Sequence, residues 1–261
     1  MNSINKTLYI PLYGKAYVSR KGIILEDKKA EEIWEKEGFR LRGKSRSKWL
    51  AYFMGMRSRV FDLWTMEKLV NLKDAVVIHI GCGMDSRVLR VGTNGHRWFD
   101  VDFPEAISER RLHFKESEEY RMLEGDARNP LWLESIPKGK ASVVIMEGVS
   151  MYLRPGEIRN LITEIGNHFD EVSILMDCYT ELSARLSKYK NPINDVGVTT
   201  VYGTDDPKAF ETENIKFTDE HDMTPDTLIN ELKGMEKAIF RRLFGGKFSK
   251  KMYRLFEYRS V

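Results

Sequence analysis

The sequence predicts an α/β protein built around a parallel β-sheet, and three observations lead to this fold class. Short apolar runs rich in β-branched residues recur along the chain, and most end at a glycine or an acidic residue. Segments with helical spacing lie between several of these runs, and such alternation is typical of parallel sheets. The 261 residues are 42% hydrophobic with a net charge of +3, which favours one large folded domain, or a domain with an added subdomain, over a disordered chain.

The first expected strand is residues 75–80, a nearly continuous apolar run typical of a parallel strand buried on both faces. A tight turn follows it at residues 81–83. Helices are expected within residues 26–72 and at 155–169, where Pro155 suits a first helical turn. Further strands are predicted at residues 97–102, 120–124, 141–146 and 171–176, with an alternating closing strand at 252–258.

Composition and hydropathy exclude several classes of protein. Mean hydropathy is −0.43, and no apolar run reaches the length of about 18 residues that a membrane-spanning helix needs. The N-terminus lacks the apolar core of a secretory signal. Two cysteines, Cys82 and Cys178, are typical of a chain in a reducing compartment, and neither has the spacing of a metal ligand. We therefore expect a cytoplasmic protein without a metal site.

A ligand site is expected where the predicted strands end. In open α/β sheets, ligands bind outside the carboxyl ends of the strands. The residues that would share this edge are Gly81, Gly83, Asp102, Asp126 and Glu147. The sequence therefore predicts a binding site with a glycine turn on one strand and acidic groups on its neighbours.

The turn after the first strand indicates which nucleotide this edge would bind. Gly81 and Gly83 allow close backbone approach, but Ser86 stands where a dinucleotide-binding loop has a third glycine. Asp102 follows Gly81 by 21 residues, close to the spacing at which an acid binds ribose hydroxyls. These two features predict a ligand that carries a nucleoside without phosphates, and S-adenosylmethionine is such a ligand. Its carboxylate would need a cation such as Lys15 or Arg57.

Several segments also resemble one known family. Residues 81–87 read Gly-Cys-Gly-Met-Asp-Ser-Arg, residues 98–104 read Trp-Phe-Asp-Val-Asp-Phe-Pro, and residues 147–153 read Glu-Gly-Val-Ser-Met-Tyr-Leu. Residues 7–16, 56–62 and 202–207 fit the same pattern. In this order, over roughly residues 7–210, the chain resembles the leucine carboxyl methyltransferase superfamily, and in particular its bacterial branch of polyketide-type carboxyl O-methyltransferases.

The resemblance implies a fold, a cofactor and a division of the chain. The fold is a Rossmann-like class I S-adenosylmethionine-dependent methyltransferase, with a seven-stranded, mostly parallel sheet. Residues 1–72 would form an N-terminal helical cap, and residues 73–261 the methyltransferase core. S-adenosylmethionine would be the cofactor and S-adenosylhomocysteine the product.

Carried over residue by residue, the resemblance also assigns site residues. It implies Lys15 and Arg57 at the methionine carboxylate, Gly81 and Gly83 along the cofactor, Asp102 at the ribose diol, Asp126 and Ala127 beside the adenine, Glu147 near the methionine amine or sulfonium, and Tyr152 at the acceptor pocket. No catalytic base is assigned, because a carboxylate acceptor with a reference pKa of about 4 is already ionised.

The expected function is methyl transfer to the carboxylate of a small molecule, such as a polyketide-type acid, or of a peptide C-terminus. Three alternatives stay open: an NAD-dependent oxidoreductase, which Ser86 disfavours, a binding protein without catalysis, and an RNA-modifying methyltransferase. The third would use residues 233–259, which hold nine Lys or Arg and two Glu. The same stretch is also explained as the solvated face of a helix that packs through Leu232, Met235, Ile239 and Leu243. We favour this explanation, and expect neither nucleic acid nor membrane as a partner.

Overall fold

The computed structural model describes residues 3–38, 43–187 and 200–261. Its strands are β1 (Val76–Ile80), β2 (Trp98–Asp102), β3 (Tyr120–Glu124), β4 (Gly139–Met146), β5 (Phe169–Tyr179), β6 (Ile215–His221) and β7 (Tyr253–Ser260). Its helices are α1 (Ser3–Arg20), α2 (Lys28–Glu37), α3 (Lys48–Asn71), α4 (Arg87–Val91), α5 (Pro104–Arg111), α6 (Pro155–His168), α7 (Glu181–Leu186), α8 (Asp226–Ile229), α9 (Gly234–Phe244) and α10 (Gly246–Lys250).

The strands form one sheet in the order β3-β2-β1-β4-β5-β7-β6. All neighbours pair in parallel except those of β7, which runs antiparallel to both β5 and β6. The expected seven-stranded, mostly parallel sheet is therefore confirmed. The strand order reverses direction between β1 and β4, and the crevice outside such a switch point is where open α/β sheets bind ligands.

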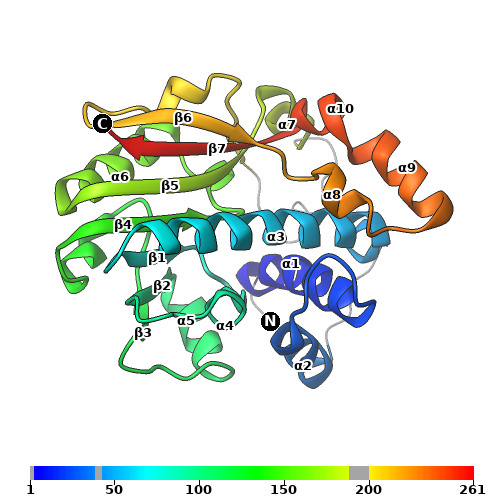
Figure 1. Cartoon of the computed structure of the whole chain (residues 1–261), viewed down its shortest axis with the longest axis horizontal. Coiled ribbons are helices and arrows are strands. Elements are labelled where there is room, and N and C mark those ends of the chain that lie inside the picture. The colour runs from blue at the N-terminus through cyan, green and yellow to red at the C-terminus, as the bar shows by residue number, and fades with distance from the viewer. Residues whose placement is uncertain (1–2, 39–42, 188–199) are drawn as a thin grey trace.

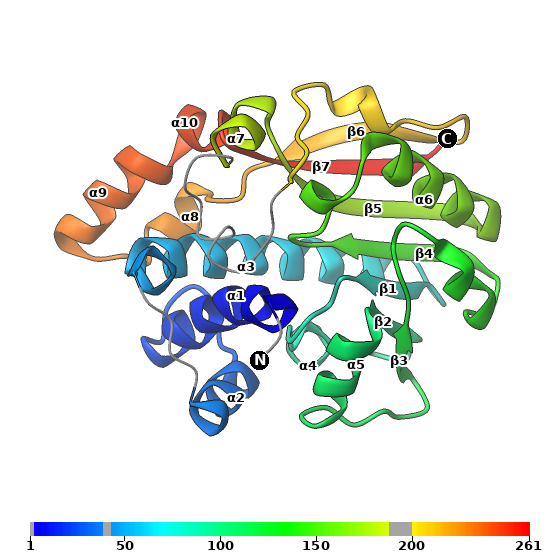
Figure 2. The ribbon, with the colours of Figure 1, turned by 180° about the vertical axis from the view of Figure 1, so that it is seen from behind.

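Helices cover both faces of the sheet. Figure 1 shows α3 crossing in front of the strands, and Figure 2, from behind, shows α6 on the opposite face. The strand β1 is buried along its whole length, and its side chains pack in the cores on both faces of the sheet. Val77 packs in the core that includes Phe61 of α3, whereas Val76 and Ile78 pack in the core that includes Leu161 of α6. This burial on both faces is why β1 reads as a continuous apolar run.

A third core joins the N-terminal helices to the C-terminal ones. Val18 of α1 and Met56 of α3 pack there with residues of α8 and α9 (Figure 1). Phe240 is the fully buried residue that α9 contributes.

The prediction of the apolar face of α9 is wrong in part. Leu232 is buried, but Met235, Ile239 and Leu243 are 82%, 41% and 47% exposed. Phe240, one position further along, instead packs against Tyr52, with ring centroids 6.1 Å apart. The helix is therefore rotated relative to the face that the sequence pattern indicated.

Two expectations about the chain as a whole can be compared with the structure. Both cysteines are buried and free, so no disulfide forms. Among the described residues, no helix combines the length and the apolar character that crossing a membrane requires.

Candidate functional site

A cavity of about 320 Å³ lies at the carboxyl ends of β1 to β4, at the switch point of the sheet. Residues of α1 and α3 close it on the other side. The structure brings all nine sequence-predicted site residues to the wall of this one cavity. They are Lys15, Arg57, Gly81, Gly83, Asp102, Asp126, Ala127, Glu147 and Tyr152.

The turn after β1 depends on its two glycines. Gly81 and Gly83 have φ angles of 67° and 47°, in the left-handed region that favours glycine. A Cβ atom on Gly81 would also lie 2.2 Å from Cγ2 of Val149, which is too close for two carbon atoms. The backbone of this turn can therefore form a cavity wall only because both positions lack side chains.

Asp102, at the end of β2, is held by the same turn. Its Oδ2 accepts a hydrogen bond from the backbone N–H of Gly83 at 2.7 Å, and its Oδ1 accepts one from that of Phe103 at 2.8 Å. Burial raises the pKa of Asp102, and these two N–H groups partly offset that effect. Each carboxylate oxygen accepts more than one hydrogen bond, so the oriented group still has capacity for ligand hydroxyls.

A buried brace behind the turn fixes the position of Gly83. Nη1 of Arg110 donates to the carbonyl oxygen of Gly83 at 2.9 Å, while Nη2 donates to Asp100. The Tyr120 hydroxyl donates to the same Asp100 oxygen at 2.7 Å. Asp100 and Arg110 are both fully buried, so the brace is rigid. Sequence reasoning assigned no role to these residues.

Arg57, from α3, binds the acidic groups at the far side of the cavity. Its Nε donates to Oε1 of Glu147 at 3.1 Å, and its Nη1 donates to Oδ2 of Asp177 at 2.9 Å. The Tyr253 hydroxyl accepts from Arg57 at 3.0 Å and donates to Asp177 at 2.7 Å. Burial alone would raise the pKa of Glu147, but Arg57 and Arg87 lower it to about 2. In this structure Arg57 therefore organises the carboxylates as well as facing the cavity.

Lys15 reaches the cavity from α1 and is buried beside the glycine turn. Its Nζ lies 3.0 Å from Oδ2 of Asp85. Arg90 and Arg87 also contact Asp85, at 2.9 and 3.4 Å, and these cations hold the pKa of Asp85 well below its usual range in spite of its burial. Lys15 is thus positioned by the turn that it faces.

Sequence reasoning missed three residues that complete the site: Asp85, Asp177 and Tyr253. Asp177 carried a visible signal, because it is an acidic residue directly beyond a predicted strand, and Asp85 lies just after the predicted glycine turn. Tyr253 carried no such signal. It reaches the site because β7 pairs antiparallel with β5, in a register that places Tyr253 opposite Tyr179.

The two ends of the cavity differ in character. Near β3, Asp126 is bound by its neighbour Arg128, whose Nη2 lies 2.6 Å from Oδ2, and Ala127 and Phe103 provide apolar surface beside it. At the other end, the rings of Tyr179 and Tyr253 meet edge to face, with centroids 4.9 Å apart. Tyr152 lies on the wall there, and burial raises its pKa.

This arrangement defines a class of protein. A parallel sheet with this strand order, a glycine turn after β1 and an acidic residue at the end of β2 forms a nucleotide-binding site of the doubly wound α/β type. The cavity wall has three parts: an acid at the end of β2, an apolar flank, and a cluster of cations and carboxylates. That set suits a nucleoside joined to a zwitterion.

Comparison with known proteins identifies the family. Residues 8–166 match the family model for leucine carboxyl methyltransferase, so the chain belongs to this family. TcmP of Streptomyces glaucescens, a tetracenomycin polyketide synthesis O-methyltransferase, is 26% identical over 246 residues, which cover 92% of this chain and 90% of TcmP. The S-adenosyl-L-methionine-dependent methyltransferase dpfgK of Gibberella zeae is 31% identical over 184 residues, 65% of this chain and 62% of that protein.

A solved structure shows the same fold. Magnesium protoporphyrin IX methyltransferase (ChlM) from Synechocystis PCC 6803, with bound SAH, has a TM-score of 0.52 and 12% identity, covering 88% of this chain and 93% of that chain. The Rossmann-like methyltransferase fold predicted from the sequence is thus confirmed. The chain is an S-adenosylmethionine-dependent methyltransferase.

The residues of the cavity fit this cofactor. Asp102 would offer a carboxylate to a ribose diol, and Phe103 and Val149 would offer apolar surface to a purine. Lys15 and Glu147 would present opposite charges to the zwitterionic end. A volume of about 320 Å³ lies within the range of small-molecule sites, roughly 300–1,000 Å³.

Proposed function

We propose that this methyltransferase methylates an oxygen of an acceptor carboxylate, on a polyketide-type small molecule or at a peptide C-terminus. The observation that carries the proposal is that the groups around the cavity that could accept a proton are paired or protonated. A hydroxyl acceptor needs a group that removes its proton, whereas a carboxylate arrives ionised. The state of each lining carboxylate, histidine and tyrosine therefore bears on which acceptor can react.

Every carboxylate among the described lining residues already has a strong partner. Asp85 is paired with Lys15, Asp126 with Arg128, and Glu147 with Arg57 and Arg87. The oxygens of Asp102 accept backbone N–H groups. A carboxylate whose pKa is lowered to about 2, as for Glu147, is a poor general base at neutral pH.

Four other titratable groups of the wall are also unsuited to proton removal. Nε2 of His79 lies 3.3 Å from Nη1 of Arg87, so its lone pair faces a cation. Burial raises the pKa of Tyr152 and of Tyr253, which keeps both hydroxyls protonated near neutral pH. Burial also raises the pKa of Cys82. An acceptor that is already ionised makes all of these groups unnecessary as bases.

The proposal assigns roles to the chain's own groups. When bound, S-adenosylmethionine supplies a methyl group that its sulfonium already activates for in-line displacement. Asp102 would bind the ribose diol, Asp126 and Ala127 would flank the adenine, and Gly81 and Gly83 would lie along the cofactor. Lys15 and Arg57 would face its carboxylate, with Glu147 near its amine.

Tyr152 would bind the acceptor, and residues 1–72 would act as a helical cap over residues 73–261. Alignment of acceptor and donor within this closed space would account for most of the rate, since effective molarities of about 10⁵ M or more are attainable by positioning. The cap excludes water, which keeps the methyl group from hydrolysis.

The test uses radiolabelled S-adenosylmethionine and matched acceptors. Each aromatic polyketide-type acid is assayed beside its primary alcohol and its amide, and each peptide acid beside its C-terminal amide. We expect label only in the acids, released as volatile methanol by mild alkali, because esters hydrolyse there and methyl ethers do not. With a carboxylic acid acceptor, kcat/KM should stay level from pH 6 to 9.

Two results would contradict the proposal. One is alkali-stable label in an alcohol or phenol, with kcat/KM rising about tenfold per pH unit as the acceptor ionises. The other is label in RNA at low salt, which would favour the basic residues 233–259 as a binding surface.

A further inference from the structure

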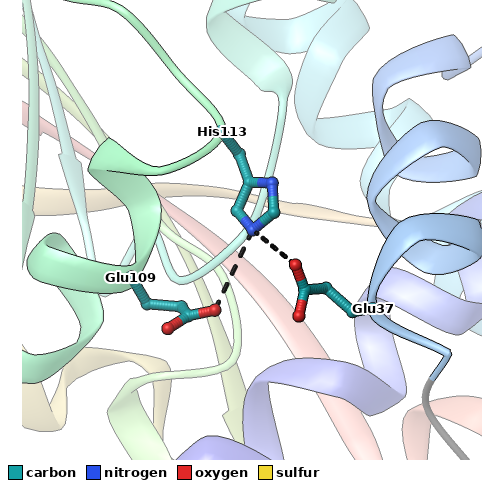
Figure 3. Close-up of side chains that lie close together, drawn as sticks. All are labelled: Glu37, Glu109 and His113. Carbon is teal, nitrogen blue, oxygen red and sulfur yellow. Dashed lines mark ion pairs between the residues drawn. The ribbon is translucent and has the colours of Figure 1, made fainter.

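A second cluster of polar side chains lies outside the cavity, where α2 approaches α5. It consists of Glu37 at the end of α2, Glu109 of α5, and His113 just after α5 (Figure 3). Each residue offers one ligand atom, and these atoms all lie within 4.8 Å of one another. Glu109 and His113 are four residues apart on one helical face, a spacing that lets two side chains reach the same point.

The imidazole of His113 is the unusual member of this cluster. The His113 side chain is 1% exposed, and its Nε2 has no hydrogen-bond partner among the described residues. Figure 3 shows that atom pointing between the two carboxylates. It lies 3.5 Å from Oε1 of Glu37 and 3.9 Å from Oε1 of Glu109, beyond the 2.7–3.2 Å or so of N–H···O hydrogen bonds.

An ion pair alone does not account for this arrangement. A buried polar atom without a partner is costly, and Nε2 of His113 lies too far from either carboxylate for a good hydrogen bond. The observed separations leave space for a further positive group between the three side chains.

The separation between His113 and Glu37 matches that of two ligands of a shared cation. Two ligand atoms that each lie about 2.1 Å from a metal at a tetrahedral angle are about 3.4 Å apart. The 3.5 Å separation from Glu37 fits this value, and the 3.9 Å separation from Glu109 requires only a small side-chain movement. A neutral imidazole with two carboxylates suits zinc and neighbouring transition metals better than magnesium or calcium, which prefer oxygen ligands throughout.

We propose that Glu37, Glu109 and His113 bind a divalent transition-metal cation, zinc being the best match, which fastens α2 to α5. The metal takes no part in methyl transfer and was not expected from the sequence. Its position nevertheless bears on the cavity, because α2 packs against α1.

Helix α1 connects the cluster to the cofactor site. Leu8 and Ile10 of α1 both line the cavity. A cation that fixes α2 against α5 therefore also fixes the helix that closes the cavity.

The experiment measures zinc binding directly, by competition with a chromophoric chelator, on the untagged full chain at pH 7.5. His113→Gln and Glu109→Gln each remove one ligand. Glu105→Gln is the matched control, because it removes the same charge from an exposed position one turn earlier in α5. Binding of S-adenosylhomocysteine checks that each variant is folded.

We expect one zinc ion per chain in the wild type and in Glu105→Gln, with affinity reduced at least tenfold in both ligand variants. Zinc should raise the Tm of the wild type by several degrees and leave that of His113→Gln unchanged. The proposal is overturned if the folded wild type binds no zinc at micromolar concentration. Equal affinity in wild type and ligand variants, or equal loss in Glu105→Gln, would overturn it as well.

Discussion

Ser86 donates a hydrogen bond of 2.5 Å to Oδ1 of Asp27, and both side chains are buried. Ser86 stands at the position where a dinucleotide-binding turn has glycine. Asp27 is the N-cap of α2, where the same oxygen accepts from the backbone N–H of Ala30, and its other oxygen accepts from Arg90. The serine that distinguishes this turn thus joins the glycine turn to the N-terminal helices.

Replacing Ser86 by alanine should lower the free energy of unfolding by about 1–2 kcal/mol, since Asp27 loses a buried donor. Ser142→Ala is the control, because Oγ of Ser142 is buried on β4 without a hydrogen-bond partner among the described residues. That variant should change stability little. Urea unfolding of both measures the difference, and equal costs would contradict the assigned role of Ser86.

Asp102→Ala and Asp102→Asn should weaken S-adenosylhomocysteine binding by about 10–100-fold, the loss expected for hydrogen bonds to a charged acceptor. The carboxylate loses its contacts to ribose, while the sheet stays intact. Glu124→Gln serves as control, as it removes a carboxylate at the exposed end of the neighbouring strand β3. Titration calorimetry measures the three affinities, and an unchanged value for Asp102→Ala would remove this residue from the site.

Tyr253→Phe should reduce both stability and turnover. The hydroxyl bridges Arg57 and Asp177, so its loss should cost about 1–2 kcal/mol and lower kcat/KM about tenfold as the cluster loosens. Tyr258→Phe is the matched change on β7, where the hydroxyl donates to the carbonyl of Pro207 away from the cavity. It should cost stability but leave kcat/KM intact. Similar kinetic losses in both would indicate a general folding defect.

Acid should destabilise the protein through Glu147. Its pKa is about 2 in the folded chain against a model-peptide value of 4.5, so the folded state favours the ionised form. The resulting stabilisation, roughly 3 kcal/mol, is complete above pH 4.5 and is lost as the pH falls toward 2. Urea unfolding at several pH values should show a shallower acid slope for Glu147→Gln than for wild type. Parallel slopes would show that other carboxylates dominate.

The sequence predicted six of the seven strands and missed β6. Apolar runs marked β1, β2, β4 and β5, because each is covered on both faces. The edge strand β6 reads Ile-Lys-Phe-Thr-Asp-Glu-His and has a single fully buried residue, Ile215. Most of its side chains are partly or fully exposed, so the strand has no apolar run to detect.

The residues of the candidate site also divide into those that the sequence could reveal and those that it could not. Glycines and acids at strand ends could be found, because strand ends share one edge of a parallel sheet. Tyr253, a partner of Arg57, could not be found, since it meets Asp177 only through the antiparallel register of β5 and β7. Nor does any local pattern show that Glu37 approaches His113, which depends on how α2 packs against α5.

The cavity takes its walls from both the first and the last elements of the fold: Leu8 of α1 and Tyr253 of β7 both line it. A ribosome-bound chain that stops short of β7 lacks the group that aligns Arg57 and Asp177. Contacts between such distant parts of a chain also form slowly. We therefore expect cofactor binding to arise late in biosynthesis, once the final strand has joined the sheet.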